Sequence, residues 1–249
     1  MRPYEERFIK QTINRYNKLI SESESGQYSI VKSKEESLSG YLYEEEKNKN
    51  LDIIKLFNDD KLIMELTPKE IEGYFEIIKN AKGKIGIVGL GLGYLAEELA
   101  NKKEVTEVVV YEISSSVIEL YKRNFKNRRK IKILNEDAYK AERQKFDFFF
   151  VDIYNEKLVE ECANDYKIFN EIHDIEEYSF WGMEHFLLSC RYEEIVWVFI
   201  PEIWMDMTND LARILDESGY MESYKPLEPK HVSNILEKFK VILNEGEEI

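Results

Sequence analysis

Short apolar runs alternate with amphipathic stretches through the middle of this chain. Each apolar run has the length of a strand, and the stretch after it has helical spacing. The predicted strands are Lys84–Val88, Glu107–Tyr111, Lys130–Leu134 and Phe146–Val151, and the predicted helices lie near Tyr94–Lys102, Ser115–Phe125 and Ala138–Arg143. This alternation predicts an α/β fold with a doubly wound, mostly parallel sheet and helices on both faces.

The first 66 residues follow a different pattern. The expected elements are a helix over Pro3–Ile20, short strands at Tyr28–Val31 and Leu38–Tyr43, and a β-hairpin at Leu56–Leu66. Thr67 then caps a new helix, with Pro68 at its first position and Glu70 at its third, as in a capping box. We therefore expect a small helix and β-hairpin region over residues 1–66 and an α/β domain over 67–249.

The C-terminal third is less regular and rich in aromatic residues. We expect largely helical structure over Asn155–Cys190, a fifth strand at Glu194–Pro201, and helices at Thr208–Ser218 and about Lys230–Leu243, so that the chain ends in a helical segment. The aromatic residues between Tyr166 and Phe186 allow two interpretations, a buried core or a lid over an apolar or cationic acceptor.

The chain is strongly acidic. Asp and Glu number 49 and Lys and Arg number 35, which gives a net charge of −14. Since an acidic surface repels phosphate backbones, we do not expect nucleic acid as a partner. One dense basic run, Lys122–Lys132, can be interpreted as a solvated helix end that complements the helix dipole or as a binding patch, and the first interpretation is preferred.

The cysteines and histidines bear on the cell compartment and on metal binding. Cys162 and Cys190 are the only cysteines, and the chain shows neither a signal peptide nor an apolar stretch of membrane-spanning length. We therefore expect a cytoplasmic protein with reduced thiols and no membrane partner. His173, His185 and His231 are far apart, and no Cys/His spacing is typical of a metal site.

The most informative motif follows the first strand of the α/β region. Gly89, Gly91 and Gly93 form a turn between this strand and a helix, an arrangement that presents backbone N–H groups to a ligand. The next strand ends at Glu112, where a carboxylate can accept both hydroxyls of a ribose. Together these features predict an adenosine-containing cofactor.

The glycine spacing distinguishes between cofactors. Nicotinamide and flavin enzymes carry Gly-x-Gly-x-x-Gly, but Tyr94 stands where their third glycine would be. The spacing Gly-x-Gly-x-Gly, together with Glu112, Ile133–Tyr139 and Phe146–Tyr154, resembles the class I S-adenosylmethionine-dependent methyltransferases. More narrowly it resembles their spermidine-synthase-like branch, over about Lys82–Tyr154. The resemblance implies a Rossmann-like methyltransferase fold, S-adenosylmethionine or its decarboxylated form as cofactor, and a homodimer as one arrangement.

The resemblance also implies roles for single residues. Gly89, Gly91 and Gly93 would approach the methionine and ribose, Glu112 would bind the ribose hydroxyls, Ile113 would lie against the adenine, Asp137 and the Ala138 N–H would contact the adenine edge, and Asp152 would face the methionine end. Asp152 and Tyr154 are the candidate catalytic residues near the acceptor. Structural alternatives stay open, with Glu112 as a polar strand end, Asp137 as a helix N-cap and Asp152 as an acceptor for loop N–H groups.

Three functions fit these residues. The Asn-Pro-Pro-Tyr type motif of amino-group nucleic-acid methyltransferases is absent, because Asp152–Asn155 occupies its place, and this favours methyl transfer to a small-molecule acceptor. Polyamine aminopropyl transfer is an alternative, although Asn155 replaces the second acid of that family and Glu156 would have to compensate. The third alternative is a protein that binds the cofactor without catalysis.

Overall fold

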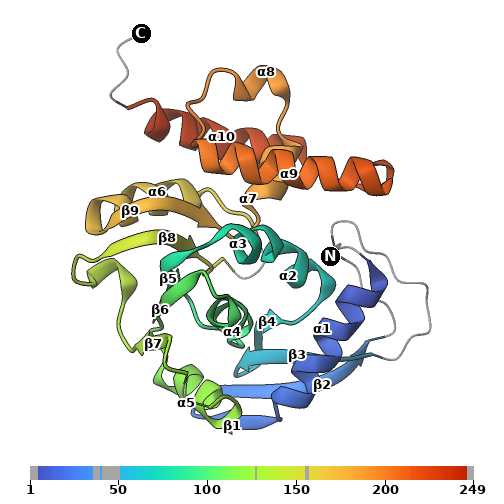
Figure 1. The fold of residues 1–249 in the computed structure, drawn as a ribbon, viewed down its shortest axis with the longest axis vertical. Coiled ribbons are helices and arrows are strands. Elements are labelled where there is room, and N and C mark those ends of the chain that lie inside the picture. The colour runs from blue at the N-terminus through green and yellow to red at the C-terminus, as the bar shows by residue number, and fades with distance from the viewer. Residues whose placement is uncertain (1–4, 36–39, 41–50, 127, 155–156, 246–249) are drawn as a thin grey trace.

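Five parallel strands form the central sheet (Figure 1). The computed structural model describes residues 5–35, 40, 51–126, 128–154 and 157–245. The strands are β5 (Gly83–Val88), β6 (Val105–Tyr111), β7 (Ile131–Leu134), β8 (Lys145–Val151) and β9 (Asp174–Phe180), in the order β7-β6-β5-β8-β9. The predicted parallel sheet and its first four strands are therefore confirmed.

The fifth strand lies elsewhere than the apolar pattern predicted. β9 pairs with β8 at the edge of the sheet, and its first half carries the acidic residues that edge strands tolerate. The expected strand at Glu194–Pro201 is wrong, because this segment holds the end of α8 (Tyr192–Ile195) and a loop. Trp197 and Phe199 are 69% and 58% exposed there, so this apolar run is not buried as a strand would be.

Helices cover both faces of the sheet. Besides α8, the helices after residue 66 are α2 (Pro68–Gly73), α3 (Phe75–Asn80), α4 (Tyr94–Asn101), α5 (Ser115–Asn124), α6 (Glu161–Ile172), α7 (Met183–Ser189), α9 (Glu202–Ser218) and α10 (Pro229–Leu243), with 3-10 turns η1 (Ala138–Lys140) and η2 (Tyr220–Ser223). The helix expected over Ala138–Arg143 is thus only a 3-10 turn. Since crossovers are right-handed, α4 and α5 lie on one face and α6, which joins β8 to β9, lies on the other.

A second, antiparallel sheet precedes the central one. It contains β1 (Ser23–Ser25), β2 (Tyr28–Glu35), β3 (Leu51–Asn58) and β4 (Lys61–Glu65) in sequential order, preceded by α1 (Glu6–Leu19). The predicted hairpin at Leu56–Leu66 is confirmed by the pairing of β3 with β4. The predicted strand Leu38–Tyr43 lies outside the described residues, apart from Gly40.

The two sheets share one hydrophobic core. Ile13 and Ile53 from the N-terminal part belong to the same buried cluster as Phe149 of β8. The ring of Tyr16 also packs edge-on against that of Tyr94, with centroids 5.0 Å apart. The division into regions 1–66 and 67–249 stays a prediction, and the continuous core shows that the two regions are packed together.

The aromatic residues of the C-terminal half form core rather than an open lid. Phe169, Phe180 and Phe186 are completely buried, and Phe180 packs against Trp204 of α9 and Phe239 of α10. Figure 1 shows α9 and α10 stacked beyond β9, at the end of the molecule away from the antiparallel sheet. None of the helices in the described ranges is long and apolar enough to cross a membrane.

His173 is buried among aromatic side chains of the core, without a charged partner among the described residues. Its ring lies 5.2 Å from those of Phe146 and Phe149, and its Nδ1 accepts the Gln144 backbone N–H at 3.3 Å. Burial lowers the pKa of His173 to about 4, and the cations Arg143 and Lys84 add to this effect. The folded protein therefore keeps this imidazole neutral at pH values where an exposed histidine is protonated.

We expect His173→Phe to reduce the loss of stability in mild acid. The unfolded chain binds a proton near pH 6.5 but the folded protein does so only near 4, so wild-type stability falls as pH drops through this window. At pH 5 the loss amounts to about 2 kcal/mol. Urea unfolding at pH 7.5 and 5 measures the difference, and equal acid losses in both proteins would contradict this account.

Candidate active site

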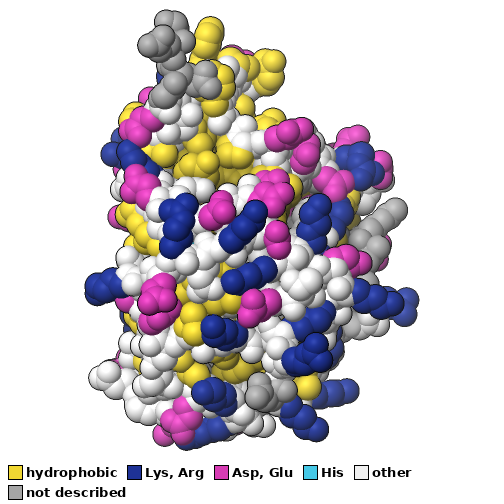
Figure 2. Space-filling model, turned by 60° about the vertical axis from the view of Figure 1, so that its left-hand side comes forward, with side chains coloured by type: hydrophobic (Ala, Val, Ile, Leu, Met, Phe, Trp, Pro, Cys, Tyr) yellow, Lys and Arg dark blue, Asp and Glu magenta, His cyan; other side chains and the backbone are white. Residues whose placement is uncertain are grey.

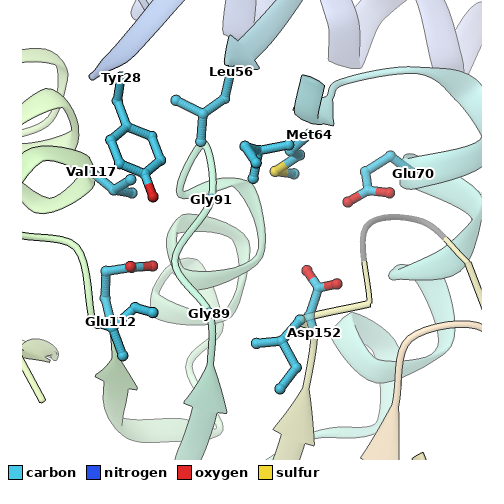
Figure 3. A pocket seen from close by; sticks show the side chains of 12 residues that line it. Tyr28, Leu56, Met64, Glu70, Gly89, Gly91, Glu112, Val117 and Asp152 are labelled. Carbon is cyan, nitrogen blue, oxygen red and sulfur yellow. The ribbon is translucent and has the colours of Figure 1, made fainter. Parts of the chain in front are cut away.

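A cavity of about 180 Å³ lies where the carboxyl ends of β5, β6 and β8 meet the antiparallel sheet (Figure 3). Its lining consists of Tyr28, Leu56, Ile63, Met64, Glu70, Gly89, Gly91, Glu112, Ile113, Val117, Asp152 and Ile153. Five predicted site residues are therefore together in one cavity, namely Gly89, Gly91, Glu112, Ile113 and Asp152. The N-terminal sheet supplies Tyr28, Leu56, Ile63 and Met64, which the sequence did not suggest as site residues.

The order of the strands explains the position of this cavity. From β5 the chain moves to β6 on one side of the sheet, and β8 pairs with β5 on the other side. The connections therefore diverge at the carboxyl end of β5 and leave a crevice between them. In open α/β sheets this switch point is where ligands bind.

All three predicted glycines adopt positive φ, at 97° for Gly89, 51° for Gly91 and 80° for Gly93. A Cβ at Gly89 would lie 2.3 Å from the Asp152 carbonyl oxygen, and one at Gly91 would lie 2.4 Å from the Met64 sulfur. Glycine is therefore required at both positions by backbone conformation and by space. Gly91 and Gly89 leave bare backbone facing the cavity, as a closely approaching ligand needs (Figure 3).

Gly93 acts differently from the other two. It precedes α4, and a Cβ there would lie 2.5 Å from the ring of Tyr121 on α5. Gly93 does not line the cavity in this structure. Its contact with the cofactor stays a prediction, and the structure gives it a packing reason as well.

The carboxylate of Glu112 points into the cavity and holds two loops. It accepts the Leu90 backbone N–H at 3.0 Å and the Ser114 N–H at 2.8 Å. Burial raises the pKa of Glu112, and the N–H donors partly oppose this shift. The carboxylate at the end of β6 thus orders the glycine turn, and its contact with the hydroxyl groups of a ribose stays a prediction.

Of the three residues predicted to contact the adenine, Ile113 lines the cavity and the other two do not. Ile113 is 74% exposed and lines it together with Val117, which gives a flat ring an apolar surface. Asp137 instead caps η1 by accepting the Tyr139 N–H at 3.1 Å and pairs with Lys140 at 2.8 Å. Neither Asp137 nor the buried Ala138 lines the cavity. The N-cap alternative for Asp137 is what the structure shows, and its adenine contact stays a prediction.

Asp152 stands at the end of β8 and faces the cavity (Figure 3). Its carboxylate accepts the hydroxyl of Tyr74, a buried residue between α2 and α3. Burial raises the pKa of Asp152 to about 6, and the Tyr74 hydroxyl acts in the opposite direction. The carboxylate therefore changes its charge close to neutral pH, in the part of the cavity where the sequence placed the acceptor.

Glu70 is a second carboxylate at this end, and sequence reasoning did not identify it as a site residue. Its backbone N–H donates to Thr67 Oγ1 at 3.4 Å, which confirms the expected helix cap. Its side chain points toward the cavity and accepts the indole N–H of Trp181 at 3.1 Å (Figure 3). The capping motif accounted for Glu70 fully in the sequence, so no unexplained signal pointed to the cavity.

Tyr154 is not part of the cavity. It is buried, and its hydroxyl donates to Asp165 at 2.8 Å, as does the hydroxyl of Tyr139. The structure thus gives it a role in packing, and its role near an acceptor stays a prediction. Asn155 and Glu156 lie outside the described residues. Within the described ranges, no three potential ligands gather to hold a metal ion.

Residues 62–180 match the family model of ribosomal RNA adenine dimethylases. The match begins in β4 and ends with β9, so it includes the central sheet and most of the cavity lining. A search among curated proteins gave no match.

Several solved structures show low-level similarity. The 23S rRNA methyltransferase ErmE is 21% identical over 42% of this chain and 42% of its own, with a TM-score of 0.35. Spermidine synthase from Thermotoga maritima is 16% identical over 62% of this chain and 52% of its own, with a TM-score of 0.38. A putative RNA methyltransferase from Pyrococcus horikoshii is 17% identical over 43% and 56%, with a TM-score of 0.33. The chain thus spans about half the length of these proteins.

The family match and the glycine turn define the class of this protein. The match over residues 62–180 supports a class I S-adenosylmethionine-dependent methyltransferase, and the matched family uses S-adenosylmethionine as its methyl donor. The bare backbone at Gly89 and Gly91, the buried carboxylate of Glu112 and the apolar Ile113 fit this cofactor. The narrower assignment to the spermidine-synthase-like branch stays a prediction, because spermidine synthase is only a distant neighbour.

The expectation that nucleic acid is not a partner is wrong. The matched family model describes enzymes that act on ribosomal RNA, which contradicts the inference from net charge. The physical reason is that a net charge of −14 describes the whole chain and does not determine the potential at one surface.

We expect Glu112→Gln to weaken binding of S-adenosylmethionine by about tenfold to a hundredfold. A neutral amide loses charge-assisted hydrogen bonds, which are worth about 1.5–3 kcal/mol. Calorimetric titration measures the affinity. Glu107→Gln, on the same strand but at its other end, is the matched control and should bind normally. Equal affinity of both variants would exclude Glu112 from the cofactor site.

Proposed function

We propose that this protein transfers a methyl group from S-adenosylmethionine to the amino group of an adenine base in RNA. The observation that supports this most directly is the family match over residues 62–180, which includes both Glu112 and Asp152. The position of Asp152 at the cavity, with Ile153 beside it, supports the same reaction.

Bound in this cavity, the cofactor supplies an electrophilic methyl group on a positively charged sulfur. The carboxylates of Glu70 and Asp152 lie at one end of the cavity, away from Glu112 (Figure 3). Two nearby carboxylates produce a negative potential that favours a cationic centre there. We therefore assign this end to the sulfonium and the acceptor, and the Glu112 end to the ribose.

Asp152 would orient the acceptor nitrogen. An ionised carboxylate accepts one N–H of the amino group and directs the nitrogen lone pair toward the methyl group. After transfer, the nitrogen carries a positive charge and must release a proton, which a carboxylate with a pKa of about 6 can accept. Tyr74 fixes the position of Asp152 through its hydroxyl group.

The base also needs an apolar contact. Tyr154 is buried and its hydroxyl is engaged by Asp165, so it does not present a ring to the cavity. Ile153 lines the cavity and is 40% exposed. We infer that Ile153 supplies the contact that an aromatic residue provides in motifs of the Asn-Pro-Pro-Tyr type.

Transfer of labelled methyl groups to RNA tests this function. The protein is incubated with labelled S-adenosylmethionine and total RNA, and the digested nucleosides are separated and identified by mass spectrometry. We expect label in adenosine methylated on its amino nitrogen. Absence of label from RNA, while the cofactor still binds, would reject the proposal.

The pH dependence tests the role of Asp152. We expect the rate to rise with pH through about 6, because only the ionised carboxylate accepts the amino N–H. Asp152→Asn should lower the rate by about tenfold to a hundredfold and remove this acid limb. Asp174→Asn, at the far end of the neighbouring strand β9, is the control and should keep it. An unchanged acid limb in Asp152→Asn would contradict the assignment.

A further inference from the structure

Basic residues are concentrated at the junction of α5 and β7. The eleven positions from Lys122 to Lys132 contain seven Lys or Arg and no Asp or Glu, in a chain with a net charge of −14. The sequence alone favoured a solvated helix end for this run. The structure provides a second observation, because the run borders a hollow in the surface.

The hollow has a volume of about 280 Å³ and combines aromatic, aliphatic and cationic walls. It is lined by Tyr121, Lys122, Phe125, Arg128, Ile131 and Ile133. The rings of Tyr121 and Phe125 are stacked, with centroids 5.0 Å apart and planes at 30°. In Figure 2, dark blue side chains gather over the lower part of the molecule, with yellow hydrophobic surface between them.

Two walls of the hollow are held in place by one buried acid. Glu97 on α4 accepts the Tyr121 hydroxyl at 2.7 Å and pairs with Arg128 at 2.7 Å. This arrangement fixes an aromatic ring and a guanidinium group before any ligand binds. A ligand that enters the hollow therefore loses little affinity to ordering of the protein.

The cations around the hollow differ in whether another group of the protein already holds them. Arg123 pairs with Glu119, and the Lys130 ammonium donates to the Lys102 carbonyl oxygen. Lys122, Lys126 and Arg129 are exposed and form no ion pair with the described residues. Lys132 lies on the opposite face of β7 from Ile131 and Ile133, because side chains alternate along a strand. We call Lys122, Lys126, Arg128 and Arg129, together with the hollow, the α5–β7 surface.

We propose that the α5–β7 surface binds RNA, with phosphates on its cations and one unpaired base in the hollow. This inference rests on the proposed function and names the surface that holds the substrate. Lys and Arg are frequent phosphate partners, and an unstacked base is commonly held against an aromatic wall of this kind. An acidic peptide would match the charges but leave the stacked rings of Tyr121 and Phe125 without a matching planar group.

The two sites lie close together along α5. Val117 lines the cofactor cavity, and Tyr121 lines the hollow one helical turn later, which corresponds to about 6 Å along the helix axis. Tyr121 also packs against Gly93 of the glycine turn. An RNA strand held on the α5–β7 surface therefore has to extend only a short distance to place another base near Asp152.

Fluorescence anisotropy with a labelled RNA hairpin that has an unpaired loop tests this surface. The variant Lys122→Glu/Lys126→Glu/Arg129→Glu should bind RNA about tenfold to a hundredfold more weakly and lower the salt slope of log K by about 2. The matched control is Lys18→Glu/Lys145→Glu/Lys230→Glu, which changes net charge equally at exposed lysines elsewhere. It should bind as the wild type does. Phe125→Leu should weaken binding about fivefold by removing a stacking ring.

The outcomes separate this inference from the proposed function. Thermal unfolding and S-adenosylmethionine binding are measured on every variant, so a folding defect is recognised directly. If the wild type methylates RNA and both triple variants bind RNA equally, the RNA-binding role of the α5–β7 surface is rejected and the proposed function stands. If the wild type binds RNA through this surface but transfers no methyl group to it, the function fails and the surface stands. If the wild type does not bind RNA, both are rejected.

Discussion

The glycine turn between β5 and α4 is in contact with three distant parts of the chain, and none of them leaves room for a side chain. The Asp152 carbonyl oxygen approaches Gly89, the Met64 sulfur approaches Gly91, and the Tyr121 ring approaches Gly93. Positive φ at all three positions adds a conformational requirement for glycine. The turn therefore depends on two constraints at each residue, and substitution at any of them would displace a different neighbour.

These contacts also build the site. Met64 brings the antiparallel sheet over the turn, so that Tyr28 and Leu56 close the cavity from above (Figure 3). The Asp152 N–H donates to the Val88 carbonyl oxygen at 3.0 Å, which holds the end of β8 against β5 and places the Asp152 carboxylate at the cavity. The N-terminal region thus forms one wall of the candidate site, and it shares the hydrophobic core of the central sheet.

Patterns in the sequence predicted those parts of the structure that depend on residues close together in the chain. Glycine spacing and strand alternation identified Gly89, Gly91 and Glu112, because a tight turn and a buried strand restrict residue type directly. Glu70 was missed because its carboxylate reaches the cavity only through tertiary packing against Trp181. The exposed Trp197 was misassigned to a strand for the related reason that apolar character does not by itself show what buries a side chain.

The net charge of the whole chain likewise does not show what one surface binds. In salt solution an exposed charge acts over about 10 Å, so RNA responds to the field of one surface and not to the sum over the molecule. Under the proposed function, the excess of acidic residues in the rest of the chain would repel phosphate and so favour contact at the α5–β7 surface. Under this proposal, a strongly acidic chain with one basic run would bind RNA in fewer orientations than a uniformly basic chain.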